Sequence, residues 1–220
     1  MLMAQECLVI FAKPAQPGRV KTRLIGAVSP AQAAALHTAF LADLIEEMLP
    51  GEFDLRLAWA LESGDERPTS EVPSMLQRGT DLGDRLHQGL RDLSARYPRV
   101  AVVGSDHPML RVSLVQQAFD KLGEGTDVVL GPAEDGGYYL MAVQSHVLSA
   151  ELFREIPWST SAVLETTLRR CRALELRVEM LSTVPDVDTP EDLSRLVTEL
   201  ERDSELSCVH TRALLRSWNE

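Results

Sequence analysis

The sequence Cys7-Leu-Val-Ile-Phe-Ala12 continues directly into Lys13-Pro-Ala-Gln-Pro-Gly-Arg-Val-Lys-Thr-Arg23, and the rest of the chain is best understood from this junction. The first segment is a continuous apolar run of strand length, which is typical of a central strand buried on both faces. The second is a Pro/Gly-rich loop with four cations and no acid: Lys13, Arg19, Lys21 and Arg23. Such a loop is a candidate phosphate site, because backbone N–H groups and Lys or Arg side chains bind phosphate oxygens.

The composition indicates a globular protein with an acidic surface. Of the 220 residues, 45% are hydrophobic and 25% are charged, and the formal net charge is -11. A sizeable core is therefore expected and a nucleic-acid partner is not. No apolar stretch approaches the roughly 18 residues of a membrane span, and the first residues do not resemble a signal peptide. We expect a cytoplasmic protein with no membrane partner, and the oligomeric state stays open.

The cysteines are too few and too scattered to suggest a disulfide or metal framework, so buried or surface thiols are expected. They are Cys7, Cys171 and Cys208.

Strand-like apolar runs alternate with helical periodicity along the whole chain. After the first strand, further strands are expected at 54–61, 100–103, 127–130, 138–143 and 177–181. Helices are expected from Pro30 up to Pro50, at 84–97, at 112–122, from a cap at 157–160 through 174, and at 190–203, with a helical turn near 148–153. This order predicts an α/β fold with a mostly parallel mixed sheet. We expect one domain over residues 1–203, with 204–220 as a further helix or a tail, and 62–74 as a mobile loop.

The unusual loops of the chain all follow predicted strands. They are 13–23, 104–108, 131–137 and 185–189. Ligands of open α/β sheets bind outside the carboxyl ends of the strands, so the topology is expected to gather these loops at one edge.

The cationic loop is not a Walker A motif. That motif needs Gly directly before Lys-Ser/Thr and another Gly five residues earlier. Here Val20 precedes Lys21-Thr22, and position 15 is Ala. The alternative to a phosphate site is a solvated basic surface loop.

Acidic residues lie in the other three loops, and each has a structural alternative. Asp106 ends a buried strand but resembles a helix cap, and Asp135 lies in a Gly-rich segment that also suits a tight turn. Asp188 precedes a helix that either Asp188 or Thr189 could cap. His107 is a candidate base or a local hydrogen-bonding residue. Together, carboxylates at three strand ends favour a divalent cation beside the phosphate loop.

Six segments of the chain, in order, resemble the motifs of the DUF2064 family, which is described as a family of GT-A-fold glycosyltransferases. The first runs from Phe11 to Leu24 and contains the cationic loop. The other five are Gly79–Leu86, Gly104–Pro108, Gly131–Leu140, Pro157–Thr160 and Asp186–Leu193. The resemblance covers roughly residues 7–196. It implies a three-layer, Rossmann-like GT-A fold of the nucleotide-diphospho-sugar transferase superfamily, which also includes molybdenum-cofactor nucleotidyltransferases and phospholactate guanylyltransferase.

Similarity to the first loops of that superfamily implies that the cationic loop holds phosphates. The residues expected to bind nucleotide or phosphate are Lys13, Gly18, Lys21, Arg23 and Asp81.

The resemblance also implies a metal. Asp106 matches the metal-binding aspartate that follows the central strand, and Asp188 stands where a related motif supplies a second ligand. Mg²⁺ or Mn²⁺ is therefore the expected cofactor. One departure is that the segment reads Ser105-Asp106 where the superfamily has Asp-x-Asp, so only one carboxylate is present there.

Three functions are consistent with these features. The first is metal-dependent transfer of a sugar from a nucleotide sugar to a small acceptor, with Asp135 or His107 as the catalytic base. The second is nucleotidyl transfer from an NTP to a phosphorylated small molecule with release of pyrophosphate. The third is nucleotide binding without catalysis.

Overall fold

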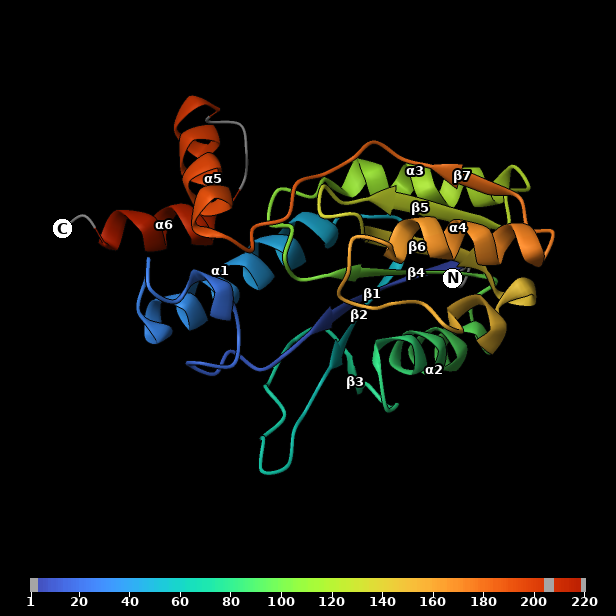
Figure 1. The fold of residues 1–220 in the computed structure, drawn as a ribbon, viewed down its shortest axis with the longest axis horizontal. Helices are drawn as coiled ribbons and strands as arrows, with labels where there is room; N and C mark the ends of the chain where they lie inside the picture. The colour runs from blue at the N-terminus through green and yellow to red at the C-terminus, as the bar shows by residue number, and fades with distance from the viewer. Residues whose placement is uncertain (1–3, 204–207, 219–220) are drawn as a thin grey trace.

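The computed structural model describes residues 4–203 and 208–218, which form seven strands, six α-helices and three short 3-10 helices (Figure 1). The strands are β1 Glu6–Ala12, β2 Asp54–Trp59, β3 Ser74–Leu76, β4 Arg99–Gly104, β5 Val128–Pro132, β6 Tyr138–Gln144 and β7 Val178–Met180. The α-helices are α1 Pro30–Met48, α2 Leu82–Ser94, α3 Val112–Gly123, α4 Val163–Ala173, α5 Pro190–Arg202 and α6 Val209–Ser217. The 3-10 helices are η1 Thr22–Leu24, η2 Ser145–Val147 and η3 Ala150–Phe153.

The sheet has the strand order β3-β2-β1-β4-β6-β5-β7, and β6 runs antiparallel to both of its neighbours. Strand β1 pairs in parallel with β2 on one side and with β4 on the other, so the apolar run 7–12 lies in the interior of the sheet as predicted. The predicted α/β class with a mostly parallel mixed sheet is therefore confirmed.

Helices cover both faces of the sheet, which makes three layers (Figure 1). On one face, Leu8 and Ile10 of β1 pack with the end of α1 and with α3. On the other face, Val9 and Phe11 pack with α2 and α4. The alternation of side chains along a strand explains why every residue of β1 is buried.

Two details of the fold differ from the sequence-based expectation. Helix α4 begins at Val163 and not at the Pro157–Thr160 segment, because Ser159 adopts a positive φ of 64° and a turn follows before the helix. In that turn, the hydroxyl of Thr160 accepts a hydrogen bond from the backbone N–H of Ala162 at 3.3 Å. Strand β3 was not predicted, since three residues are too few to show a period.

The three cysteines are buried, free thiols, as expected. Among the residues that the structure describes, none of the helices combines the length and apolar character that a bilayer crossing requires.

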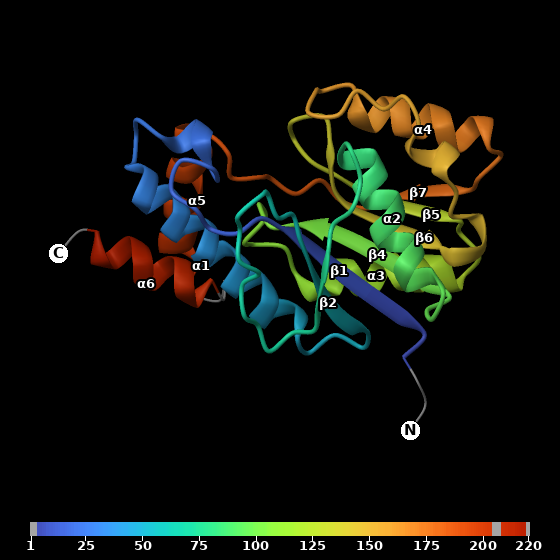
Figure 2. The same cartoon turned by 90° about the horizontal axis from the view of Figure 1, so that it is seen from below.

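Helices α5 and α6 lie beside α1, at the end of the sheet toward which β1 and β4 run (Figure 2). A small apolar cluster joins these helices to η1. Its buried members are Leu24, Leu36, Phe40, Val187, Leu193, Leu196, Leu200 and Cys208. The part of the 204–220 segment that the structure describes is thus a helix packed on α1, whereas residues 204–207 and 219–220 lie outside the described residues.

Helix α6 is capped by a side chain from another helix. Asp43 of α1 is 2% exposed, and its two carboxylate oxygens accept hydrogen bonds from the backbone N–H groups of His210 and Thr211 at 2.8 and 2.9 Å. The Thr211 hydroxyl donates to the same carboxylate at 2.5 Å. The first N–H groups of a helix lack partners within the helix, and the Asp43 carboxylate accepts hydrogen bonds from two of them. Its negative charge also interacts favourably with the positive end of the helix dipole.

We predict that Asp43→Ala lowers the free energy of unfolding by about 2 kcal/mol or more, since it leaves buried N–H groups unsatisfied. Urea unfolding followed by circular dichroism measures this. The matched control is Glu46→Ala on the same helix, whose side chain is 58% exposed and whose loss is expected to cost less than about 0.5 kcal/mol. Equal costs for the two variants would contradict the capping role.

Candidate functional site

The loops after β1 and β4 meet the segment before α5 at the carboxyl edge of the sheet. Four charged side chains lie together there: Lys21, Arg23, Asp106 and Asp188. We call these four residues the strand-end cluster. The sequence places them in three of the four loops that were expected at this edge, and the structure brings these three loops into contact.

Lys21 is the central residue of the strand-end cluster. Its ammonium group lies 2.5 Å from Oδ1 of Asp106 and 3.1 Å from Oδ1 of Asp188, and it donates to the Val187 carbonyl at 2.7 Å. The side chain is only 2% exposed, and the ammonium lies 5.4 Å from the centre of the Phe40 ring. An ammonium group has three N–H donors, so all three are engaged in this arrangement.

Backbone geometry delivers Lys21 to this position. Its φ of 48° is in the left-handed region, which few non-glycine residues adopt, and η1 starts at the next residue. Leu24 of η1 is fully buried in the apolar cluster with α1 and α5. Packing of this hydrophobic residue therefore fixes the turn that directs Lys21 inward.

Asp188 is free to face the cations because its neighbour caps the helix. The Thr189 hydroxyl accepts from the N–H of Asp192 at 3.2 Å, and the Asp192 carboxylate accepts from the N–H of Thr189 at 2.8 Å, which completes a capping box. Of the two residues that could have capped α5, Thr189 does so. Asp188 also approaches Arg23 at 3.4 Å.

A backbone hydrogen bond holds Asp106 beside this segment: the N–H of Val187 donates to the Asp106 carbonyl at 3.2 Å. The Asp106 side chain remains 44% exposed. The surrounding protein partly desolvates this carboxyl, which raises its pKa, but the neighbouring Lys21 ammonium outweighs that effect and holds the pKa below its usual value of 3.8. Asp106 is therefore ionised at neutral pH.

Two further carboxylates lie nearby. Asp135 is exposed in the loop between β5 and β6, and its Oδ1 accepts from the N–H of Gly137 at 2.8 Å. Burial and the negative charges of Asp135 and Asp188 raise the pKa of Asp186. Ala133 forms an isolated parallel bridge with Val184, so the loop that carries the predicted base Asp135 lies beside the segment that carries Asp188.

His107 is buried, at 6% exposure. Its Nδ1 donates to the Pro185 carbonyl at 3.1 Å, and its ring lies 5.6 Å from that of Tyr139. Burial lowers the pKa of His107 below 6.5, although the Pro185 carbonyl partly offsets this. These contacts favour the local hydrogen-bonding alternative over the role of a base.

The remaining predicted residues occupy different surroundings. Lys13 is exposed, and its carbonyl accepts from Nε2 of the buried His37 at 2.9 Å. Gly18 has a φ of +80° with open space around it, so backbone conformation is the reason for glycine there. Asp81 caps α2 by accepting from the N–H of Asp84 at 2.8 Å.

The sequence did not indicate that Asp65 holds the cationic loop. Asp65 accepts from Nε2 of Gln16 at 2.8 Å and from both terminal nitrogens of Arg19 at 2.9 and 3.2 Å. It also accepts from the N–H of Glu62 at 2.8 Å, and its side chain is 3% exposed. Residues 62–65 are thus tied to the cationic loop, and Arg19 is neutralised by acids that lie over 40 residues away.

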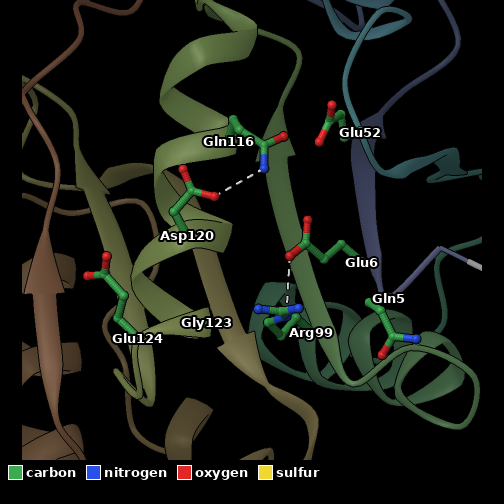
Figure 3. A pocket seen from close by; sticks show the side chains of 8 residues that line it. All are labelled: Gln5, Glu6, Glu52, Arg99, Gln116, Asp120, Gly123 and Glu124. Carbon is green, nitrogen blue, oxygen red and sulfur yellow. Dashed lines mark hydrogen bonds and ion pairs between the residues drawn. The ribbon is translucent and has the colours of Figure 1, made fainter.

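The cavity drawn in Figure 3 is at the opposite end of the sheet. It has a volume of about 590 Å³ and opens beside Glu6 and Arg99, the first residues of β1 and β4, which pair at 3.2 Å. Its lining residues are Gln5, Glu6, Glu52, Arg99, Gln116, Asp120, Gly123 and Glu124. With four carboxylates and one cation, this lining is a poor match for a polyphosphate.

Within the described residues, one group of metal-ligand type lies between α1 and α6: Asp43, Glu46 and His210, whose ligand atoms are within 4.8 Å of one another. Both carboxylate oxygens of Asp43 already accept hydrogen bonds from α6. This group therefore serves the packing of α6.

Comparisons with known proteins agree with the fold. A family model described as "Uncharacterized protein conserved in bacteria (DUF2064)" matches residues 48–160. A crystal structure of a candidate nucleotide-diphospho-sugar transferase from Desulfovibrio desulfuricans G20 is 32% identical, with a TM-score of 0.88, over 98% of this chain and 95% of that one. No curated protein matches.

Two more distant structures share the fold alone. CMP:2-keto-3-deoxy-manno-octonic acid synthetase in complex with CTP is 14% identical, with a TM-score of 0.57, over 90% of this chain and 99% of that one. Rv0371C of Mycobacterium tuberculosis H37Rv in complex with manganese is also 14% identical, with a TM-score of 0.51, over 87% and 97% of the two chains.

We predict that Asp65→Ala loosens the cationic loop, because it removes four hydrogen bonds to Gln16, Arg19 and Glu62. Amide hydrogen exchange in peptides covering residues 13–20 is expected to accelerate several-fold. Glu62→Ala is the control, since Glu62 touches Arg19 through a side chain that is 70% exposed. Unchanged exchange in the Asp65 variant would show that the loop is held by other contacts.

A second prediction concerns pH. In the unfolded chain, the His107 imidazole is protonated near the ordinary histidine pKa of 6.5. In the folded chain, burial lowers the pKa of His107, so this imidazole is protonated only at lower pH. His107 therefore costs stability as pH falls below 6.5. In His107→Asn, the loss of unfolding free energy between pH 7.5 and 5 is expected to be smaller by up to roughly 1 kcal/mol. Urea unfolding at the two pH values measures this, and equal losses in both proteins would contradict it.

Proposed function

The chain belongs to the DUF2064 family, and from this membership and the strand-end cluster we propose that it transfers a sugar from a nucleotide sugar to a small acceptor with the help of Mg²⁺ or Mn²⁺. The observation that carries the proposal is the convergence of two carboxylates and two cations at the carboxyl edge of the sheet. Ligands of such sheets bind at this edge. The 32% identical relative described as a candidate nucleotide-diphospho-sugar transferase supports the choice of donor.

The strand-end cluster fits a divalent cation. Oδ1 of Asp106 and Oδ1 of Asp188 both lie within 3.1 Å of one cationic nitrogen, so they are close enough to share a single positive ion. Carboxylate oxygens are the ligands that Mg²⁺ and Mn²⁺ prefer. Bound there, the ion would neutralise charge on the phosphates of the donor and of the departing nucleotide.

The other residues act on the donor and the acceptor. Arg23, whose side chain is 66% exposed, and exposed Lys13 are proposed to bind the phosphates. Gly18, with its left-handed φ of +80°, turns the loop that carries these cations. Asp135 is exposed, and its loop pairs with the segment before α5 through Ala133 and Val184, so we assign it the role of accepting the proton of the attacking acceptor hydroxyl.

Nucleotidyl transfer is the second candidate, because the fold is shared with a synthetase in complex with CTP. In that reaction, a phosphorylated acceptor attacks the α-phosphorus of an NTP and pyrophosphate leaves. The same carboxylates and cations would stabilise either leaving group. A nucleotide-binding module without turnover is the third.

A product assay separates these functions. With Mg²⁺ or Mn²⁺, we expect release of nucleoside diphosphate from a panel of sugar nucleotides and small acceptors. Release of pyrophosphate from an NTP panel would instead support nucleotidyl transfer. If the protein binds nucleotide in a metal-dependent way but releases neither product, the result would support the third function, nucleotide binding without catalysis.

Asp106→Asn is the matched variant for this assay, since it removes one negative charge while retaining side-chain size. Metal-dependent nucleotide binding is expected to weaken by about tenfold or more, as measured by calorimetry. Unchanged affinity would remove Asp106 from the metal site.

A further inference from the structure

Among the residues that the structure describes, Lys21 is the one buried lysine or arginine, and its surroundings differ from those expected of a phosphate-binding lysine. A phosphate-binding lysine without its ligand is expected to expose its ammonium group to solvent, but the Lys21 side chain is only 2% exposed. Its three donors are directed at Asp106, Asp188 and the Val187 carbonyl. In this arrangement, Lys21 has no donor left for a ligand.

The two carboxylates around Lys21 are the residues proposed to hold the divalent cation. The Lys21 ammonium therefore occupies the position of positive charge between them. Two carboxylates that face each other without a cation repel, and a compact cation between them removes this repulsion. Lys21 and a divalent ion serve the same electrostatic purpose at the same pair of oxygens.

We propose that Lys21 is an internal counter-ion of Asp106 and Asp188, and that it exchanges with the divalent cation. In the arrangement described, Lys21 holds the two carboxylates together. When a metal ion takes its place, Lys21 leaves the pair, and its ammonium becomes available to the phosphates of the donor. This inference rests on the proposed function for the identity of the metal ligands, and it adds a positioning role and a coupling between metal and donor.

The surrounding contacts are suited to such an exchange. Asp106 is 44% exposed and Asp188 is 30% exposed, so an ion can reach both carboxylates from solvent although Lys21 is buried beneath them. Lys21 directly precedes η1, whose first two residues, Thr22 and Arg23, are exposed. The lysine side chain is long and flexible, so the ammonium can move without displacement of buried Leu24.

The first test compares Mn²⁺ binding by the wild-type protein and by Lys21→Met, without nucleotide, using electron paramagnetic resonance of free Mn²⁺. Met keeps an apolar stem beside Phe40 and removes the charge. The variant is expected to bind Mn²⁺ roughly tenfold more tightly, because the ion no longer competes with an ammonium. Arg23→Met is the control, since Arg23 also pairs with Asp188 but is 66% exposed; its gain is expected to be smaller. A variant that binds Mn²⁺ no more tightly than the wild type would overturn the exchange.

Any binding of Mn²⁺ at Asp43, Glu46 and His210 is common to both proteins and cancels in this comparison. Thermal unfolding of the same two proteins tests whether Lys21→Met is merely unstable. In EDTA, the unfolding temperature of the variant is expected to be lower than that of the wild type. Added Mn²⁺ is expected to raise the unfolding temperature of the variant by more than it raises that of the wild type. Loss of stability that Mn²⁺ does not restore would point to a purely structural lysine.

A second test uses the wild-type protein, so it does not depend on a variant. The sequence contains three lysines: Lys13, Lys21 and Lys121. Brief acetylation by an amine-reactive ester, read by peptide mass spectrometry, is expected to modify exposed Lys13 and to spare Lys21. Saturating Mn²⁺ is expected to raise modification of Lys21 several-fold relative to Lys13. Continued protection of Lys21 would overturn the exchange, whereas the product assay above decides the proposed function separately.

Discussion

One ammonium group connects the parts of the molecule on which the site depends. Lys21 comes from the loop after β1, Asp106 from the end of β4, and Val187 and Asp188 from the segment before α5. A buried lysine is costly unless its charge is paired and its donors are satisfied. Here both conditions are met, and the three segments are consequently held in one arrangement. The apolar cluster of α1, α5 and η1 closes over the stem of this lysine, so packing and charge pairing support each other.

Local sequence signals account for most of the fold. The apolar run 7–12 specified an interior strand because both faces of a central strand need apolar side chains. Ser29-Pro30 and Thr189-Pro190 specified helix starts, and both form capping boxes in the structure. The signals failed where the structure depends on a single backbone angle or on very few residues. The positive φ of Ser159 delays α4, and β3 has only three residues.

The site could be predicted only as a set of loops. Strand order places the loops at one edge, which is a consequence of parallel pairing. Which charge faces which is decided by contacts between residues far apart in the sequence, and no local pattern encodes them. The loop 13–23 shows this clearly: its lack of acids suggested free positive charge, but Arg19 is neutralised by Asp65 and Lys21 by Asp106 and Asp188. The other two cations of this loop are accessible to solvent: the Arg23 side chain is 66% exposed, and Lys13 is an exposed residue.

The charge balance of the strand-end cluster then suggests why metal and donor would bind together. Its two cations and two carboxylates cancel, so the cluster by itself has little attraction for a polyphosphate in a protein of net charge -11. Entry of a divalent cation between the carboxylates gives the cluster two surplus positive charges, a change that favours an anionic diphosphate. On this view, Lys21 keeps the ligand-free site neutral and stable. The same lysine, once released, adds its charge to the donor side of the site, so affinity for the donor depends on prior or simultaneous binding of the metal.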